Sequence, residues 1–140
     1  MKNIFVVLMI SIPSLAMAGW TSGNKLNSDL SHEPNDFCSA GFASGYISAV
    51  ADQASEATSS NIKFLAETKS FTPKERSELL LEIGRHGVCF PKGVTRGQLV
   101  TIVKKWLSSN PDRWNENASG LVEEALQGSF PCATLDDFFK

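Results

Sequence analysis

The residue types that most often carry covalent chemistry are few in this chain. Its 140 residues include three cysteines and two histidines: Cys38, Cys89, Cys132, His32 and His86. A cysteine beside a histidine would be a nucleophile for acyl transfer, and a low thiol pKa would need a helix start or a nearby cation. His32 lies in a polar segment, and His86 ends a predicted helix, where a cationic imidazole suits the helix dipole. A cysteine hydrolase therefore stays an alternative, and the sequence does not favour it.

Metal and acid–base sites are weakly indicated as well. The run His86-Gly-Val-Cys89 has the spacing of half a zinc site, but a closed site needs four ligands and a second suitable pair is missing. Asp52 and Glu56 are one helical turn apart without a partner carboxylate, so a solvated helix surface accounts for them. The G-x-S-x-G, Walker, H-E-x-x-H and C-x-x-C motifs do not occur. We expect no catalytic, metal or cofactor site, and therefore a binding protein.

Residues 1–18 have the three parts of a secretory signal peptide. Lys2 gives a positive start, Ile4–Ile12 an apolar run, and Ala16-Met17-Ala18 a cleavage site. The run is too short to span a bilayer, so we expect export and no membrane insertion after cleavage. Cleavage leaves 122 residues, enough for one core. It removes one cation and no acid, so the formal charge of −2 becomes −3, which gives no support to nucleic-acid binding.

The three cysteines predict one disulfide and one free thiol, because an exported compartment permits disulfides. The sequence alone does not fix the connectivity. Cys89 and Cys132 each lie at the edge of a predicted helix near a proline, whereas Cys38 lies inside an apolar helix and is expected to be a buried small hydrophobe. We favour the pair Cys89–Cys132. Closing its loop of 43 residues stabilises the fold by about 4 kcal/mol in the chain-entropy model.

A polar loop with one tryptophan is the clearest candidate for binding. It contains Asp112, Arg113, Trp114, Asn115 and Glu116. Tryptophan and arginine are the residues that most often anchor interfaces, but Trp114 is equally suited to fold back as a hydrophobic staple on the last helix. If the loop binds a partner, alanine at Trp114 and Arg113 weakens binding more than about tenfold and hardly changes the melting temperature.

Apolar periodicity predicts an all-α fold, a small single-domain helical bundle. Residues 19–35 form a polar lead-in with at most one helical turn, at Leu26–Leu30. The helix Asp36–Ala57 is apolar or small around its circumference, so we expect it to be buried. Four of its residues form a small-residue face: Gly41, Gly45, Ser48 and Asp52. That face is either a dimer seam or a site of close packing within the subunit.

Further helices follow along the chain. Residues 58–72 are mixed, with a short helix at Ile62–Lys69. The helix Pro73–His86 starts after the N-cap Thr72; the residues expected to be buried are Leu79, Leu80 and Ile83. The central helix starts at the capping box of Thr95 and Gln98 and ends at Asn110-Pro111. Its apolar stripe consists of Leu99, Ile102, Val103, Trp106 and Leu107. The last helix, Ala118–Gly128, is capped by Asn117, and residues 133–140 form a tail without periodicity.

Five segments occur in an order and at distances that resemble a known family. They are Gly45-Tyr46-Ile47-Ser48-Ala49-Val50-Ala51-Asp52, Cys89-Phe90-Pro91-Lys92-Gly93-Val94-Thr95-x-x-Gln98, Leu107-x-x-Asn110-Pro111, Leu121-Val122-x-x-Ala125-Leu126 and Phe130-Pro131-Cys132. This set, from about Cys38 to Cys132, resembles the Tai family of type VI secretion amidase immunity proteins. The sequence departs from the family pattern at Ala49, where glycine is usual, which concerns helix packing.

The resemblance implies that residues 36–132 form a helical immunity domain, periplasmic and usually homodimeric. Its partner would be a cognate peptidoglycan amidase effector, inhibited sterically, so that the producer is protected from itself and its siblings. Because the matched residues are mostly fold residues, we infer the contacts: the loop Asp112–Glu116 as a plug, and the exposed helix face with Glu78, Glu82 and Arg85 as supporting surface. Rival classes are a periplasmic adaptor or chaperone and a small Cys/His hydrolase.

Overall fold

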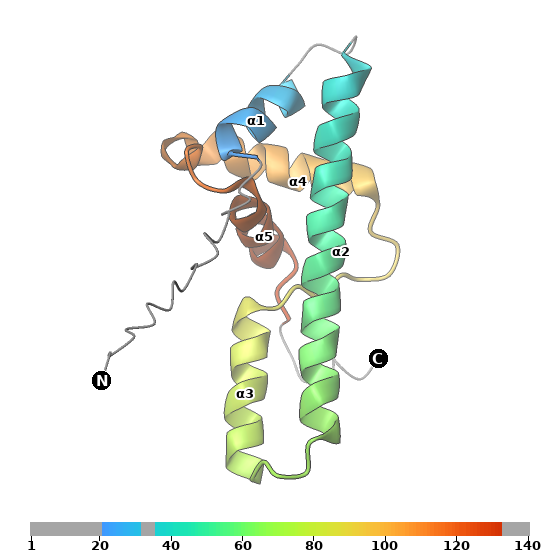
Figure 1. Ribbon diagram of the computed structural model, residues 1–140, viewed down its shortest axis with the longest axis vertical. Helices are drawn as coiled ribbons and strands as arrows, with labels where there is room; N and C mark the ends of the chain where they lie inside the picture. The colour runs from blue at the N-terminus through green and yellow to red at the C-terminus, as the bar shows by residue number, and fades with distance from the viewer. Residues whose placement is uncertain (1–20, 32–35, 133–140) are drawn as a thin grey trace, which may run out of the picture.

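The computed structural model describes residues 21–31 and 36–132 of the chain (Figure 1). Its elements are α1 (Gly23–Ser31), α2 (Phe37–Glu67), α3 (Pro73–His86), α4 (Arg96–Ser109), the 3-10 helix η1 (Pro111–Arg113) and α5 (Ala118–Ser129). In these ranges no strand occurs, only two isolated β-bridges, Ser22–Asn117 and Val88–Pro131. The predicted all-α fold is confirmed. The predicted signal peptide, His32 and the tail 133–140 lie outside the described residues.

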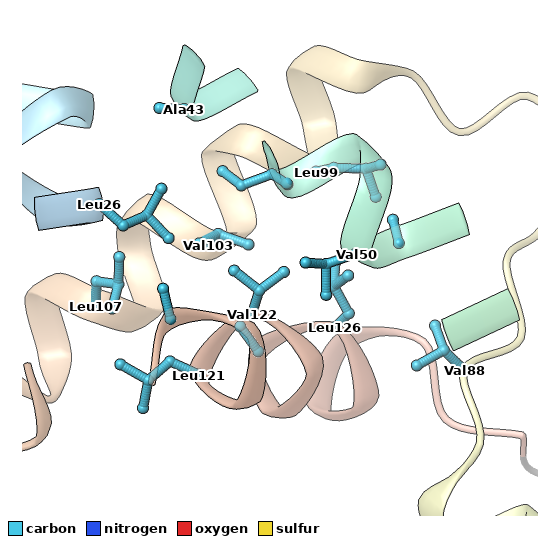
Figure 2. Close-up of a cluster of buried hydrophobic side chains, with 14 residues drawn as sticks. Leu26, Ala43, Val50, Val88, Leu99, Val103, Leu107, Leu121, Val122 and Leu126 are labelled. Carbon is cyan, nitrogen blue, oxygen red and sulfur yellow. The ribbon is translucent and has the colours of Figure 1, made fainter. Parts of the chain in front are cut away.

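One hydrophobic core lies where α1, the first part of α2, α4 and α5 meet (Figure 2). Fully buried aliphatic side chains come from all four helices: Leu26, Ile47, Val103, Leu107, Leu121, Val122 and Leu126. Each contributes about 1.5–3 kcal/mol by leaving water. The predicted stripe of α4 is confirmed: Leu99, Val103 and Leu107 are buried, and the larger Ile102 and Trp106 are half-buried at its edges.

The polar lead-in contributes more to the fold than predicted. It forms the nine-residue helix α1, whose Leu26 is fully buried in the core. Asp29 is only 2% exposed, and its Oδ1 lies 2.5 Å from Lys25 Nζ one turn earlier. Such a pair keeps a buried carboxylate from being left without a counter-charge. Composition did not reveal this helix, because only three of its nine residues are buried and the others are mostly polar.

The predicted break after Ala57 is wrong, because α2 runs without interruption for 31 residues. The segment Thr58–Asn61, between the two predicted helices, contains neither glycine nor proline, and the Thr58 hydroxyl donates to the carbonyl of Ala54 inside the helix at 2.9 Å. Poor intrinsic helix formers are tolerated where packing holds them. Here α3 packs alongside, and residues 62–67 of the predicted short helix Ile62–Lys69 form the end of α2, which stops two residues earlier than that prediction.

The second part of α2 and α3 form a helical hairpin that extends away from the core (Figure 1). We call residues 58–86 the arm. The bounds of α3 and its start at Thr72 are as predicted, and Thr72 and Glu75 complete a capping box. The predicted burial is wrong: α3 has no buried residue, Leu79 is 38% exposed, and Leu80 and Ile83 are only half-buried. A helix that packs against one neighbour alone cannot enclose its apolar face.

Candidate binding surfaces

Two of the three cysteines are joined in a disulfide and the third is free. Cys89 and Cys132 form the predicted disulfide, so neither offers a thiolate. Cys38 is free and exposed, which corrects its expected burial: the start of α2 projects past the core. His86 is exposed, with its Nε2 3.1 Å from Glu82. Among residues 21–31 and 36–132, no group of three or more His, Cys, Asp or Glu side chains is placed to hold a metal ion.

Arg113, in the predicted binding loop, is bound to two carboxylates of its own chain. Its Nε lies 2.7 Å from Glu116 Oε1, and its Nη1 lies 2.5 Å from Glu124 Oε2 on α5. The guanidinium also lies over the ring of Trp106, 5.3 Å from its centroid. Hydrogen bonds from Arg113 are the main cause that lowers the pKa of both Glu116 and Glu124. Arg113 therefore fastens the loop to α4 and α5.

Trp114 is half-buried and packs against the core; it thus folds back onto its own chain, as the alternative interpretation expected, but with its indole bonded to α4 and not to the last helix. Its indole Nε1 donates to the carbonyl of Leu107 at the end of α4, at 2.8 Å. Its own carbonyl accepts from the Asn24 amide at 2.6 Å, and the carbonyl of Glu116 accepts from the Gly23 amide at 3.0 Å. The loop is thus fixed to α1 and α4. Alanine at Trp114 or Arg113 is now expected to lower stability as well as any binding.

The ion pairs of Arg113 predict a pH dependence that can be measured. A carboxylate whose folded pKa is below its ordinary value of about 4.3 stabilises the fold above that value, and this contribution is lost as pH falls through the folded pKa. We expect Arg113→Ala to lower the melting temperature at pH 7, and the difference from wild type to shrink as pH falls from about 5 to 3. Thermal unfolding followed by circular dichroism at several pH values measures it.

The control for this prediction is Arg85→Ala, which breaks an exposed pair with Glu82. Such pairs contribute little, so its difference from wild type is expected to be small at every pH. If Arg113→Ala lowered the melting temperature by the same amount at every pH from 7 to 3, the charge pairing would not contribute to stability. The loss would then come from the packing of Arg113 on Trp106.

The outer face of α3 carries the other predicted contacts and one that the sequence did not reveal. Glu78, Glu82 and Arg85 are all exposed, and Arg85 Nη1 lies 3.6 Å from Glu82 Oε2. Leu81 is 61% exposed among them. Residues on a helix advance by 100° each, so three consecutive leucines cannot all face α2. The run Leu79-Leu80-Leu81 contained this signal, and its most exposed member is a large apolar side chain beside charged ones.

A third exposed surface is the start of α2. Phe37 is 81% and Phe42 48% exposed, which corrects the expected burial of this part of the helix, and Gly41 and Gly45 are also exposed. A Cβ atom added to either glycine would meet no described atom within 4 Å. The chain has no charged residue between Asp36 and Asp52. The small-residue face is therefore not packed against another helix of the described part of the subunit.

The predicted partner contacts fall on two separate surfaces. Residues 112–116 lead into the start of α5, whereas the end of α3 meets the far end of α5, where Gln127 Nε2 donates to the carbonyl of His86 at 2.6 Å. The 12 residues of α5 span about 18 Å. The structure thus does not bring the two sets together into one site, and α5 lies between them.

The described residues thus form a small helical protein with one disulfide and exposed surfaces on α2, α3 and residues 112–116. Residues 22–132 match the family model of the Rap1a immunity proteins, and the chain belongs to that family. An immunity protein binds a cognate effector, so the broader class expected from the sequence motifs, an effector immunity protein, is confirmed. No curated protein and no solved structure matches the chain. Of the described helices, none combines the length and apolar character that crossing a membrane requires.

Proposed function

We propose that this chain is a periplasmic immunity protein that binds a type VI secretion peptidoglycan amidase effector and blocks its substrate cleft by shape. The match to the Rap1a immunity family over residues 22–132 carries the proposal. The ordered motifs that resemble amidase immunity proteins support the choice of effector. The signal-peptide pattern of residues 1–18 supports the location, because peptidoglycan and the enzymes that cleave it are outside the cytoplasm.

Steric inhibition is consistent with the structure of residues 112–116 and of the outer face of α3. A loop that is already fixed loses little conformational entropy on binding, and residues 112–116 are fixed by Arg113 and Trp114. The side chains of Asp112 and Asn115 remain exposed to contact the effector. On α3, Leu81 is the apolar anchor, and Glu78, Glu82 and Arg85 are its rim. An anchor excluded from water by a polar rim is the usual form of an interface hot spot.

One effector is large enough to contact both surfaces. A standard interface buries about 800 Å² on each partner, which is a patch some 30 Å across. The 12 residues of α5 span about 18 Å, and Glu78 lies about 12 Å before the end of α3, so a patch of this width can reach both surfaces. The arm and residues 112–116 would then contact the effector on two sides of its substrate cleft.

The test uses the mature chain and the amidase that we expect to be encoded beside its gene. Equimolar chain should form one tight complex and abolish cleavage of purified peptidoglycan. The chain alone should leave peptidoglycan intact in a zymogram. Cleavage by the chain itself would show a hydrolase, and weak binding to many periplasmic proteins without inhibition would show an adaptor or chaperone.

We further propose that the chain is a homodimer through the start of α2. An isologous interface places one patch against its own copy, and an uncharged patch meets no repulsion there. Exposed Phe37 and Phe42 provide apolar area, and Gly41 and Gly45 allow two helix backbones to come close. Phe42 also stacks on Tyr46 and lies under Lys25, and both rings of the patch keep exposed area for a second copy.

The double variant Phe37→Glu/Gly41→Glu is expected to be a monomer when wild type is a dimer. Two carboxylates facing their own copies repel and would be desolvated without partners, so dimer affinity should fall more than about a hundredfold. Light scattering after gel filtration measures the mass. Phe64→Glu, on an exposed ring of the arm, is the matched control and should remain dimeric. A double variant with the wild-type mass would place the dimer interface elsewhere.

A further inference from the structure

The turn before α4 has a fixed shape although it does not belong to the core. Pro91, Lys92 and Gly93 are all exposed. Gly93 has φ of +87°, and in the described part of the chain no other residue has a positive φ. A Cβ atom on Gly93 would meet no described atom within 4 Å, so glycine is needed here for the shape of the turn and not for close packing.

Both ends of this turn are anchored within a few residues. At the start, Cys89 is joined to Cys132, its amide donates to the carbonyl of Phe130 at 2.9 Å, and the rings of Phe90 and Phe130 are 5.1 Å apart. At the end, the Thr95 amide donates to Gln98 Oε1 at 2.8 Å in the capping box. The exposed residues between these anchors are therefore preorganised.

The turn also lies in a long segment of the chain whose charged side chains are all basic. From Ile83 to Pro111 the sequence has no acidic residue; its cations are Arg85, Lys92, Arg96, Lys104 and Lys105. The whole chain is mildly acidic, so this segment departs from the rest. Lys92 and Arg96 are both exposed, and neither takes part in a salt bridge of the described structure.

Fold stability does not explain these two cations. A helix start carries partial positive charge and favours acidic side chains. The first turn of α4 has no acid, and Arg96 is its first residue. Lys92 lies four residues earlier, so both charges add to the positive end of the helix. Positive charges that lower the stability of a helix at its start are expected where those charges contribute to binding a partner.

We infer that the turn Pro91–Gly93 and Arg96 form a cationic docking element for an acidic patch on the surface of the effector protein. This inference rests on the proposed function and adds a third contact, at the other end of α4 from residues 112–116. A fixed, exposed pair of charges steers diffusional encounter and so raises the association rate more than it slows dissociation. Glycine at position 93 and the disulfide hold the pair in place.

The test is the kinetics of binding to the purified neighbouring amidase at two ionic strengths. For Lys92→Glu/Arg96→Glu we expect the association rate to fall at least about tenfold at 50 mM salt, and the deficit to fall below about threefold at 0.5 M, where the charges are screened. The dissociation rate should stay within about twofold. Gly93→Val keeps both charges but disfavours the turn, and should weaken affinity at least about fivefold.

Lys104→Glu/Lys105→Glu is the matched control, with the same change of charge at the other end of α4; melting curves verify that each variant folds. An equal loss in the control would show a general effect of net charge and would overturn the inference. So would a wild-type association rate in Lys92→Glu/Arg96→Glu, or binding to phosphatidylglycerol vesicles that depends on Lys92, which would point to a membrane. A wild-type chain that does not bind the amidase would overturn the proposed function as well.

Discussion

Leu81→Glu is expected to weaken effector binding at least about a hundredfold and to leave stability within about 0.5 kcal/mol of wild type. Leu81 is 61% exposed on α3, so the free protein loses little when it is replaced. In the complex that we propose, the same position is buried. Loss of an apolar anchor costs about 2 kcal/mol or more, and an unpaired carboxylate in its place adds a desolvation cost.

The matched control for this prediction is Ala66→Glu. Ala66 is exposed on α2, the other helix of the arm, and the substitution introduces the same charge. Its effect on affinity should stay within about threefold, because rim charges contribute little. Titration calorimetry gives both affinities, and thermal unfolding gives both stabilities. An unchanged affinity for Leu81→Glu would remove α3 from the interface and leave residues 112–116 as the contact.

Gly23→Ala is expected to destabilise the fold by about 2–3 kcal/mol, although it adds a single methyl group in the first turn of a helix. That Cβ would lie 2.5 Å from Leu121 Cδ1 and 2.9 Å from the carbonyl oxygen of Trp114. The leucine methyl could move, but the backbone of Trp114 is held by its own hydrogen bond to Asn24. The clash therefore displaces either α1 or the loop 112–116.

Urea denaturation measures this loss, and Gly120→Ala is its control. Gly120 lies in the first turn of α5, where an added Cβ would meet no described atom within 4 Å. There the change should raise stability by about 0.5–1 kcal/mol, because alanine favours a helix more than glycine does. If both variants had the same stability, α1 would not be clamped to the loop as the structure shows.

Those parts of the fold that depend on neighbouring residues could be predicted from the sequence. The bounds of α3 and α4 follow from the capping residues Thr72 and Thr95, and the stripe of α4 follows from its periodicity. The disulfide could be chosen because two cysteines lie at helix edges. The predictions that were wrong concern which side chains are buried. Cys38 lies on an apolar helix and Leu79 in the apolar stripe of α3, but exposure depends on where the other helices end, which periodicity does not tell.

The candidate site could be predicted only in outline. The loop 112–116 was found by its composition, but Arg113 is held by Glu124, eleven residues away, and the carbonyl of Trp114 by Asn24, ninety residues away. Contacts between residues so far apart in the sequence leave no local sequence pattern. The family resemblance supplied the class of function, and the residue-level surfaces came from the structure, including Leu81 and the fixed turn at Gly93.

The absence of buried residues from α3 has a consequence for how such proteins diverge. Core positions tolerate few changes, because each lost methylene group costs stability. The outer side of the arm has no such constraint, so new side chains can appear there while the scaffold folds unchanged. Lineages that inherit this framework are thus free to alter which toxin they neutralise in step with the toxin itself, without first acquiring spare stability.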